Sequence, residues 1–137
     1  MGLALQPIVT ALFANSPLKD GKPSGYQSYR SHALHNELGG RYGSMLPEAF
    51  EEGFGFKKFA EFAAKLPLVG IYVDEEFHQL QKGETFETFM EGKLAHFPGR
   101  KPTLDDWANH LNTIWPEVRV RHCLEMRGAD CGPEEML

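Results

Sequence analysis

Residues 117–130, with the sequence EVRVRHCLEMRGAD, alternate between apolar and mainly ionic side chains. Successive side chains of a β-strand point to opposite faces, so this period of two predicts one extended strand with a core face and a charged face. The predicted core face carries Val118, Val120, His122, Leu124 and Met126. The opposite face carries Arg119, Arg121, Cys123, Glu125 and Arg127. The fold must therefore include a sheet that is buried on one side only.

The charged face of this strand offers two chemical interpretations. Along an extended strand, each step of two residues covers roughly 7 Å, and this spacing separates Arg121, Glu125 and Arg127 in a row. A carboxylate can hold Mg²⁺ together with water and phosphate oxygens, and an arginine can bind a phosphate or a carboxylate through two hydrogen bonds. Such a row suits phosphoryl transfer. Alternatively, the face is solvated, and arginine and glutamate form weak pairs between strands.

The overall charge excludes several classes of partner. The chain of 137 residues has a net charge of -5 and a pI near 5.7, so it lacks the basic character of proteins that bind nucleic acid or anionic membranes. The apolar start, residues 1–15, is shorter than the ~20 residues that a membrane span needs. We therefore expect neither nucleic acid nor a membrane as a partner. The length suits one domain or part of a larger one.

The two cysteines, Cys123 and Cys131, are too few for a disulfide framework, and their spacing fits no four-ligand zinc pattern. A reducing cytoplasm is the simplest setting for such a chain. His32 and His35 are expected to be surface or hydrogen-bonding residues rather than zinc ligands, because no supporting cysteine or carboxylate pattern surrounds them.

The first half of the chain predicts one helix and one long loop. Apolar residues at helical spacing predict a core helix that stops at the NSP sequence of residues 15–17, because the residue before a proline avoids helical geometry. Residues 16–45 are rich in Gly, Pro, Ser and Asn and predict a long irregular connection that carries Arg30 and Arg41.

The second half predicts three amphipathic helices and a short strand. The helices are expected in residues 55–67, 84–95 and 103–115, and the strand in residues 68–73. Thr103 is the expected N-cap of the last helix, reinforced by Asp106. The residues expected to point inward are Phe56, Phe59, Ala60, Ala63, Phe86, Phe89, Met90, Trp107, Leu111 and Ile114. The layout is α+β.

Several sequence strings resemble one family in their order along the chain. They are GLALQPIVTALFANSP, YRSH, MLPEAF, GFGF, GKL followed by PG, DWANHL and LEMRGAD. Together they closely resemble the plant and proteobacterial type of glutamate-cysteine ligase, a branch of the glutamine-synthetase-like carboxylate-amine ligases. This resemblance covers essentially the whole chain. It implies that residues 1–137 form a single partial catalytic domain with a glutamine-synthetase-like fold, built from antiparallel strands and amphipathic helices.

The resemblance also implies an activity and a set of site residues. Such an enzyme uses ATP and Mg²⁺ to phosphorylate the γ-carboxylate of glutamate, and the amine of cysteine then displaces phosphate, which is the first step of glutathione synthesis. By this resemblance, Glu125 is a candidate metal ligand. Arg121, on the same charged face, is a candidate nucleotide contact. Arg127 is the candidate catalytic residue, which would bind phosphate or the glutamate carboxylate. Arg30 is expected to meet the α-carboxylate of the substrate.

The sequence departs from the family pattern at several positions. Phe62 stands in place of a usual tyrosine, and Lys65 in place of an aspartate, which puts the choice of acceptor amine in doubt. An aromatic residue is also missing after Arg30, where the chain reads RSHAL. His96 stands where the plant enzymes have a cysteine, and no cysteine lies near Gln81. This pattern favours a bacterial type without a thiol switch in this stretch.

The family enzymes are several times longer than this chain, and most of their metal ligands and nucleotide contacts lie in an N-terminal portion. We therefore expect a fragment that needs this missing portion as a partner and is inactive alone. Two alternatives stay open. In the first, the chain is a non-enzymatic remnant that acts as an interaction module. In the second, it is part of a related ligase with a different acceptor amine.

Overall fold

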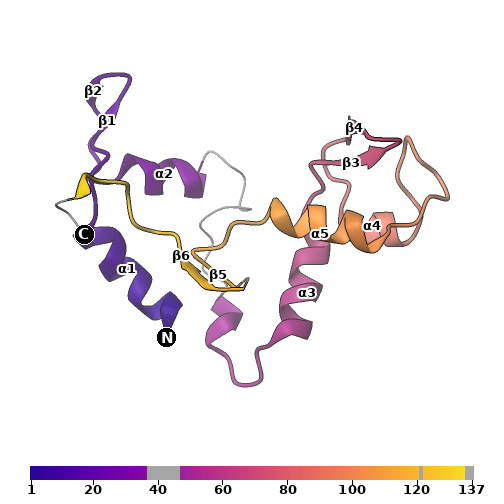
Figure 1. The fold of residues 1–137 in the computed structure, drawn as a ribbon, viewed down its shortest axis with the longest axis horizontal. Coiled ribbons are helices and arrows are strands. Elements are labelled where there is room, and N and C mark those ends of the chain that lie inside the picture. Colours follow the sequence, from indigo (N-terminus) through magenta and orange to yellow (C-terminus); the bar gives the residue numbers. More distant parts are fainter. Residues whose placement is uncertain (37–46, 121, 135–137) are drawn as a thin grey trace. The chain divides into compact units, whose positions relative to one another are not determined.

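The computed structural model describes residues 1–36, 47–120 and 122–134. Helices and short antiparallel strands follow one another along the chain, which confirms the predicted α+β class (Figure 1). The chain divides into two units: residues 1–46 with 115–137 form unit 1, and residues 47–114 form unit 2. The expectation of a single domain stays a prediction. Among the described residues, no helix is long and apolar enough to cross a membrane.

The described part of unit 1 contains two helices and two small hairpins. Its elements are α1 (Gly2–Leu12), β1 (Leu18–Lys19), β2 (Lys22–Pro23), α2 (Tyr29–Asn36), β5 (Val118–Val120) and β6 (Leu124–Met126). The turn between β1 and β2 has φ values of 50° at Asp20 and 75° at Gly21. Aspartate and glycine tolerate this left-handed geometry better than most residues, which explains the hairpin at this point.

The prediction of a long irregular connection over residues 16–45 is wrong for its described part. That part contains the β1–β2 hairpin and the eight-residue helix α2. Among the described residues of this segment, the glycines and prolines lie in and around the hairpin, whereas α2 contains neither. Residues 37–46, which include Arg41, lie outside the described residues.

The prediction of one continuous strand over residues 117–130 is also wrong. The segment forms the antiparallel hairpin β5–β6, in which Val118 pairs with Met126 and Arg119 with Glu125. Both arms of a hairpin keep a period of two, so the alternation does not show where the chain turns. The expected core face is not buried at β6, where Leu124 is 59% exposed.

Helix α1 forms at the predicted place but is not the core helix that its apolar residues predict. Leu5, Ile8 and Leu12 are exposed, and the one buried residue of the helix is Gln6, which is 2% exposed. Helix α1 instead turns Gly2 toward Val118 of β5 and Gln6 toward Glu117, the residue before that strand. The apolar spacing therefore indicated a helix correctly, but it did not indicate which face of the helix is covered.

Unit 2 holds the main apolar core. Its elements are η1 (Pro47–Phe50), α3 (Phe56–Lys65), β3 (Gly70–Val73), β4 (Glu76–Gln79), α4 (Phe86–Met90) and α5 (Leu104–Asn112). The core cluster consists of Leu68, Ile71, Leu80, Phe86, Phe89 and Leu94. The hairpin β3–β4 confirms the predicted strand and adds a partner strand that the sequence analysis did not identify.

The capping box predicted for α5 is confirmed. The Thr103 hydroxyl accepts a hydrogen bond from the Asp106 backbone N–H at 3.2 Å, and the Asp106 carboxylate accepts one from the Thr103 backbone N–H at 2.8 Å. The predicted inner face of this helix is confirmed in part. Trp107 packs against the core cluster, and Ile114, just beyond the end of α5, is buried, but Leu111 is only partly buried. The buried residues of α5 itself are Asp106 and His110.

Two of the inward-facing predictions in unit 2 are wrong. Phe56 is 85% exposed because it stands at the first residue of α3, before the helix reaches its neighbours, whereas Ala63 near its end is fully buried. Met90 is 46% exposed, and α4 ends there instead of continuing to residue 95. Gly92 follows with a φ of 74°, a left-handed conformation that stops a helix.

Candidate functional site

The Glu125 carboxylate lies between two guanidinium groups in unit 1. Its Oε2 atom accepts hydrogen bonds from Arg119 Nε at 2.9 Å and from Arg127 Nη1 at 3.1 Å, and Arg119 Nη2 lies 2.8 Å away. The antiparallel register of β5 and β6 places Arg119 directly opposite Glu125. Arg127 follows two residues after Glu125, on the same side of the chain. The hairpin therefore assembles an arginine–glutamate–arginine cluster.

This cluster keeps Glu125 ionised. The hydrogen bond from Arg119 is the largest cause of a lowered pKa for the Glu125 carboxyl. Desolvation opposes this effect, and Arg127 lowers the pKa further through its own hydrogen bond and charge. On this charged face, Glu125 thus pairs with arginines, including Arg119 on the neighbouring strand. Such pairing between strands was the alternative to a metal-phosphate site in the sequence analysis.

Arg127 is held by two neighbours besides Glu125. Its guanidinium carbon lies 5.4 Å from the centroid of the Trp115 ring, a cation–π arrangement. Its backbone N–H donates to the Glu117 carbonyl at 2.9 Å. Arg127 is therefore fixed at both its backbone and its side chain, as a residue that binds an anion needs to be.

We expect substitutions of the two arginines to raise the pKa of Glu125 by different amounts. Arg119→Met should raise it more than Arg127→Met, because the hydrogen bond from Arg119 is the larger cause of the lowered value. The measurement is a titration of the Glu125 carboxyl carbon by NMR. Lys58→Met serves as the control for the loss of one positive charge, because Lys58 pairs with Glu51 in unit 2. Equal shifts in the two arginine variants would contradict the expected order.

A second carboxylate, Asp130, joins the two ends of unit 1. Its Oδ2 accepts hydrogen bonds from the Asn15 backbone N–H at 2.7 Å and from the Ser16 hydroxyl at 2.6 Å. Its Oδ1 accepts one from the Ser28 hydroxyl at 2.9 Å. Burial raises the pKa of Asp130, but these hydrogen bonds and the charge of Arg30 outweigh it and lower the pKa. Asp130 thus links residues more than 100 positions apart.

Arg30 lies beside this second carboxylate. Its backbone N–H donates to Ser16 Oγ at 3.1 Å, which positions the first turn of α2. Its Nη1 atom is buried and has no hydrogen-bond partner among the described residues. The structure therefore brings Glu125 and Arg127 together at β6 and places Arg30 in the Asp130 cluster. Arg121, the predicted nucleotide contact, lies outside the described residues.

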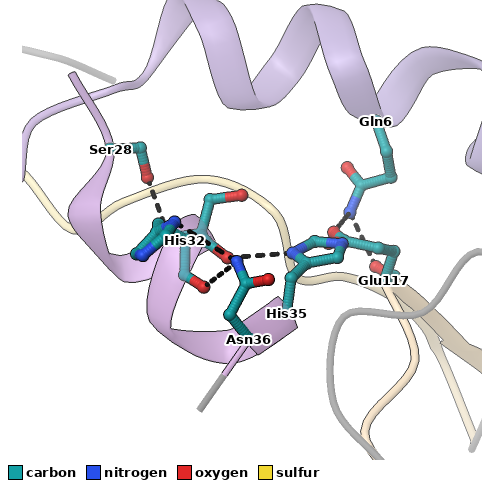
Figure 2. Close-up of polar contacts among 7 residues, drawn as sticks. Gln6, Ser28, His32, His35, Asn36 and Glu117 are labelled. Carbon is teal, nitrogen blue, oxygen red and sulfur yellow. Dashed lines mark hydrogen bonds and ion pairs between the residues drawn. The ribbon is translucent and has the colours of Figure 1, made fainter. Parts of the chain in front are cut away.

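A third polar group links α1, α2 and the residue before β5 (Figure 2). Gln6 Nε2 donates to the Glu117 backbone carbonyl at 2.7 Å and to Glu117 Oε2 at 3.0 Å. Glu117 Oε1 lies 3.7 Å from His35 Nε2. Gly128 passes this group so closely that an added Cβ would meet Glu117 Oε2 at 2.8 Å. This explains the glycine of the RGAD sequence.

Sequence reasoning missed Gln6, Glu117 and Asp130 as partners in these clusters. Gln6 lies in an apolar helical run, and its contact with Glu117 spans 111 positions, so no local pattern indicates it. The one available signal was Asp130 itself, a charged residue beside glycine after the alternating segment. His35, which was expected to form hydrogen bonds, donates through Nδ1 to the Ser31 carbonyl at 2.9 Å.

The described residues do not by themselves make up a magnesium site. Mg²⁺ prefers near-octahedral oxygen coordination and is usually bound through one or two carboxylates, waters and phosphates. At β6, Glu125 supplies a single carboxylate that is already paired with Arg119 and Arg127. In the parts of the chain that the structure describes, no group of three or more His, Cys, Asp or Glu side chains could hold a metal ion.

A comparison with known families identifies the family of this chain. The family model named Glutamate-cysteine ligase family 2 (GCS2) matches residues 1–137, so the chain belongs to this family. The resemblance found in the sequence strings is therefore confirmed.

Three plant relatives show how much of a family protein the chain represents. Glutamate–cysteine ligase A, chloroplastic, of Oryza sativa subsp. japonica is 52% identical over 132 residues, which are 96% of this chain and 26% of the rice protein. The chloroplastic enzymes of Nicotiana tabacum and Arabidopsis thaliana are 52% and 49% identical over 132 residues, 25% of each relative. The chain thus spans about a quarter of the length of these relatives.

Proposed function

We propose that this chain contributes to the active site of a glutamate-cysteine ligase. Such an enzyme uses ATP and Mg²⁺ to join the γ-carboxylate of glutamate to the amino group of cysteine, the first step of glutathione biosynthesis. The observation that carries the proposal is the family match over residues 1–137, together with 52% identity to the rice enzyme. Glutamate and cysteine are accordingly the proposed substrates, and the rest of a longer ligase is the proposed partner.

Two arginines of this chain are proposed to bind the anionic groups of such a reaction. Arg127, held over Trp115 and beside Glu125, is suited to donate hydrogen bonds to a phosphate or to the glutamate carboxylate. Arg30 has a buried donor atom that lacks a partner among the described residues, which supports a role in binding the substrate α-carboxylate. Arg121 stays a proposed nucleotide contact.

The proposed metal role of Glu125 carries a structural condition. Its Oε2 atom is paired with Arg119 and Arg127, so coordination of Mg²⁺ by this atom would require an ion pair to open or to be shared with the ligand. Further oxygen ligands would have to come from other parts of a longer ligase. When bound, Mg²⁺ would neutralise charge on the ATP phosphates.

A chimera tests the proposed function. The matching 132-residue segment of the rice enzyme would be replaced by this chain, and ADP formation that depends on glutamate and cysteine would be measured. We expect the chimera to be active, whereas the 137-residue chain alone forms no ADP. In the chimera, Arg127→Lys and Arg30→Lys should each reduce kcat/KM by about 100-fold or more, because lysine cannot form the two-pronged contact.

The matched control for the chimera is Arg100→Lys, a change of the same kind at a partly exposed position in unit 2, where the side chain donates a hydrogen bond to the Tyr72 carbonyl. It should leave activity nearly unchanged. A folded chimera without ligase activity would contradict the proposed function. Unchanged kinetics in the Arg30 or Arg127 variant would remove that residue from its proposed role, and substrate-dependent ADP formation by the chain alone would contradict the expected inactivity.

Two observations keep alternative functions in view. Phe62 is partly buried and packs against Phe59 with ring centroids 6.3 Å apart, and Lys65 is exposed, so this helix lacks the usual tyrosine hydroxyl and aspartate charge. A ligase with another acceptor amine would form ADP with glutamate and that amine.

The exposed apolar stripe of α1 favours an interaction module, because such a stripe is normally covered.

The proposed setting of the protein is the bacterial cytoplasm. It rests on Gln81 and His96, which occupy the region of the plant cysteines and whose Nε2 atoms lie 3.0 Å apart in a side-chain hydrogen bond. The plant relatives are named as chloroplastic proteins, so their names do not support a bacterial cytoplasm as the setting of this chain.

A further inference from the structure

A pocket in unit 1 has no part in the roles proposed above. Its volume is about 510 Å³, which is within the range of small-molecule sites. Helix α1 lines one side, α2 lines another, and Glu117 reaches into it from the segment before β5. Figure 2 shows Gln6, Glu117 and His35 pointing toward one another in this region.

The pocket is rich in hydrogen-bond acceptors that lack a close donor. Glu117 is only 8% exposed, and its Oε1 atom lies 3.7 Å from His35 Nε2, which is longer than a hydrogen bond. Gln6 Oε1 is buried and has no partner among the described residues. A buried carboxylate and a buried amide oxygen are both costly when they are not satisfied.

The hydrogen bond of His35 defines a third acceptor. Its Nδ1 atom lies 2.9 Å from the Ser31 carbonyl, and because a carbonyl only accepts, Nδ1 carries the hydrogen. In the neutral ring, Nε2 is then an acceptor. It faces Glu117 Oε1, another acceptor, across 3.7 Å. A donor placed between the two atoms would satisfy both.

We propose that this pocket binds a small molecule through its primary ammonium group. An ammonium group carries a positive charge and three N–H donors, which match the carboxylate of Glu117 and the acceptor atoms of His35 and Gln6. Pro7, Ala11 and Ala14 provide an apolar wall for the carbon chain of such a ligand.

A carboxylate ligand fits this pocket less well. The side chains of His32 and Asn36 could donate to it, and both line the pocket. Asn36 Nδ2 already donates to the His32 carbonyl at 2.9 Å, and a carboxylate would lie near the negative charge of Glu117. Like charges in a partly buried site repel one another, so the charge of the pocket favours a cation.

Three probes of similar size test the proposal on the full 137-residue chain: propylammonium, propionate and propanol. Binding is followed by chemical-shift changes in amide NMR spectra, without ATP, so the result does not depend on ligase activity. We expect saturable binding of propylammonium, with shifts at α1, α2 and Glu117, and weaker binding of the other two. Stronger binding of propionate, or no saturable binding of propylammonium, would overturn the proposal.

Two variants locate the binding site. Glu117→Gln keeps an acceptor for Gln6 but removes the charge, and it should weaken propylammonium binding about tenfold. Glu61→Gln makes the same change at an exposed position of α3 and should have no effect. If Glu117→Gln does not fold, His35→Leu decides, because His35 is partly exposed and its loss should weaken binding about fivefold. Unchanged affinity in the folded variant would contradict the proposed site.

Discussion

Replacing Gly70 with alanine is expected to lower the free energy of unfolding of unit 2 by about 3 kcal/mol. A Cβ atom at this position would lie 2.5 Å from the His78 backbone carbonyl and would overlap the Phe77 ring. Gly70 pairs with Gln79 at the end of the β3–β4 hairpin, so the clash falls on the strand that carries Ile71 of the core. The backbone carbonyl cannot move aside as a flexible side chain can.

The midpoint of urea unfolding and the hydrogen exchange of the β3–β4 amides measure this effect. Gly55→Ala is the matched control, because no atom lies within 4 Å of a Cβ added there and the backbone is extended. The control should change the stability by less than about 1 kcal/mol. A Gly70→Ala chain as stable as this control would show that the hairpin does not have the close packing described here.

Replacing Asp130 with asparagine is expected to destabilise unit 1 by about 2 kcal/mol at pH 7, because hydrogen bonds to a charged acceptor are lost. The effect depends on pH in a defined direction. Folding lowers the pKa of Asp130 below its ordinary value of 3.8. The ionised carboxylate therefore stabilises the folded state above that value, and this stabilisation is lost as the pH falls through the lower folded pKa.

Urea unfolding of the two chains at several pH values measures the Asp130 effect. The difference between wild type and Asp130→Asn should be largest near neutral pH and should shrink below pH 3.8. Glu134→Gln, a change at an exposed position near Asp130 in the sequence, is the control and should show little difference at any pH. A difference that grows as the pH falls would contradict the role described for this carboxylate.

Features governed by neighbouring residues were predicted well. The capping box of α5 depends on Thr103 and Asp106, which are three residues apart, and the sequence identifies it directly. The strand in residues 68–73 was also predicted, since a short apolar run between turn signals is typical of a strand. Both predictions require no knowledge of the rest of the fold.

Features governed by distant residues were not predicted. The apolar residues of α1 correctly indicated a helix, but the position of β5 decides that Gln6 rather than Leu5 is buried. The alternation of residues 117–130 indicated strands, yet the turn that sets Arg119 opposite Glu125 left no signal in it. Family resemblance identified Arg30, Glu125 and Arg127 as candidates, and the neighbours of these residues became apparent only in the structure.

The positions of the two units along the chain decide which of them can fold first during synthesis. Unit 1 consists of residues 1–46 and 115–137, so the whole of unit 2 is made before the second part of unit 1 exists. On a ribosome, α1 and α2 must wait for Glu117 and Asp130, whereas the core of unit 2 has all its residues by position 114. Because nascent chains fold from the N-terminus as whole units emerge, unit 2 is expected to fold first. During that interval the Gln6 side chain lacks Glu117, its partner in the folded unit, so this polar group of α1 stays hydrated until the last part of the chain is made.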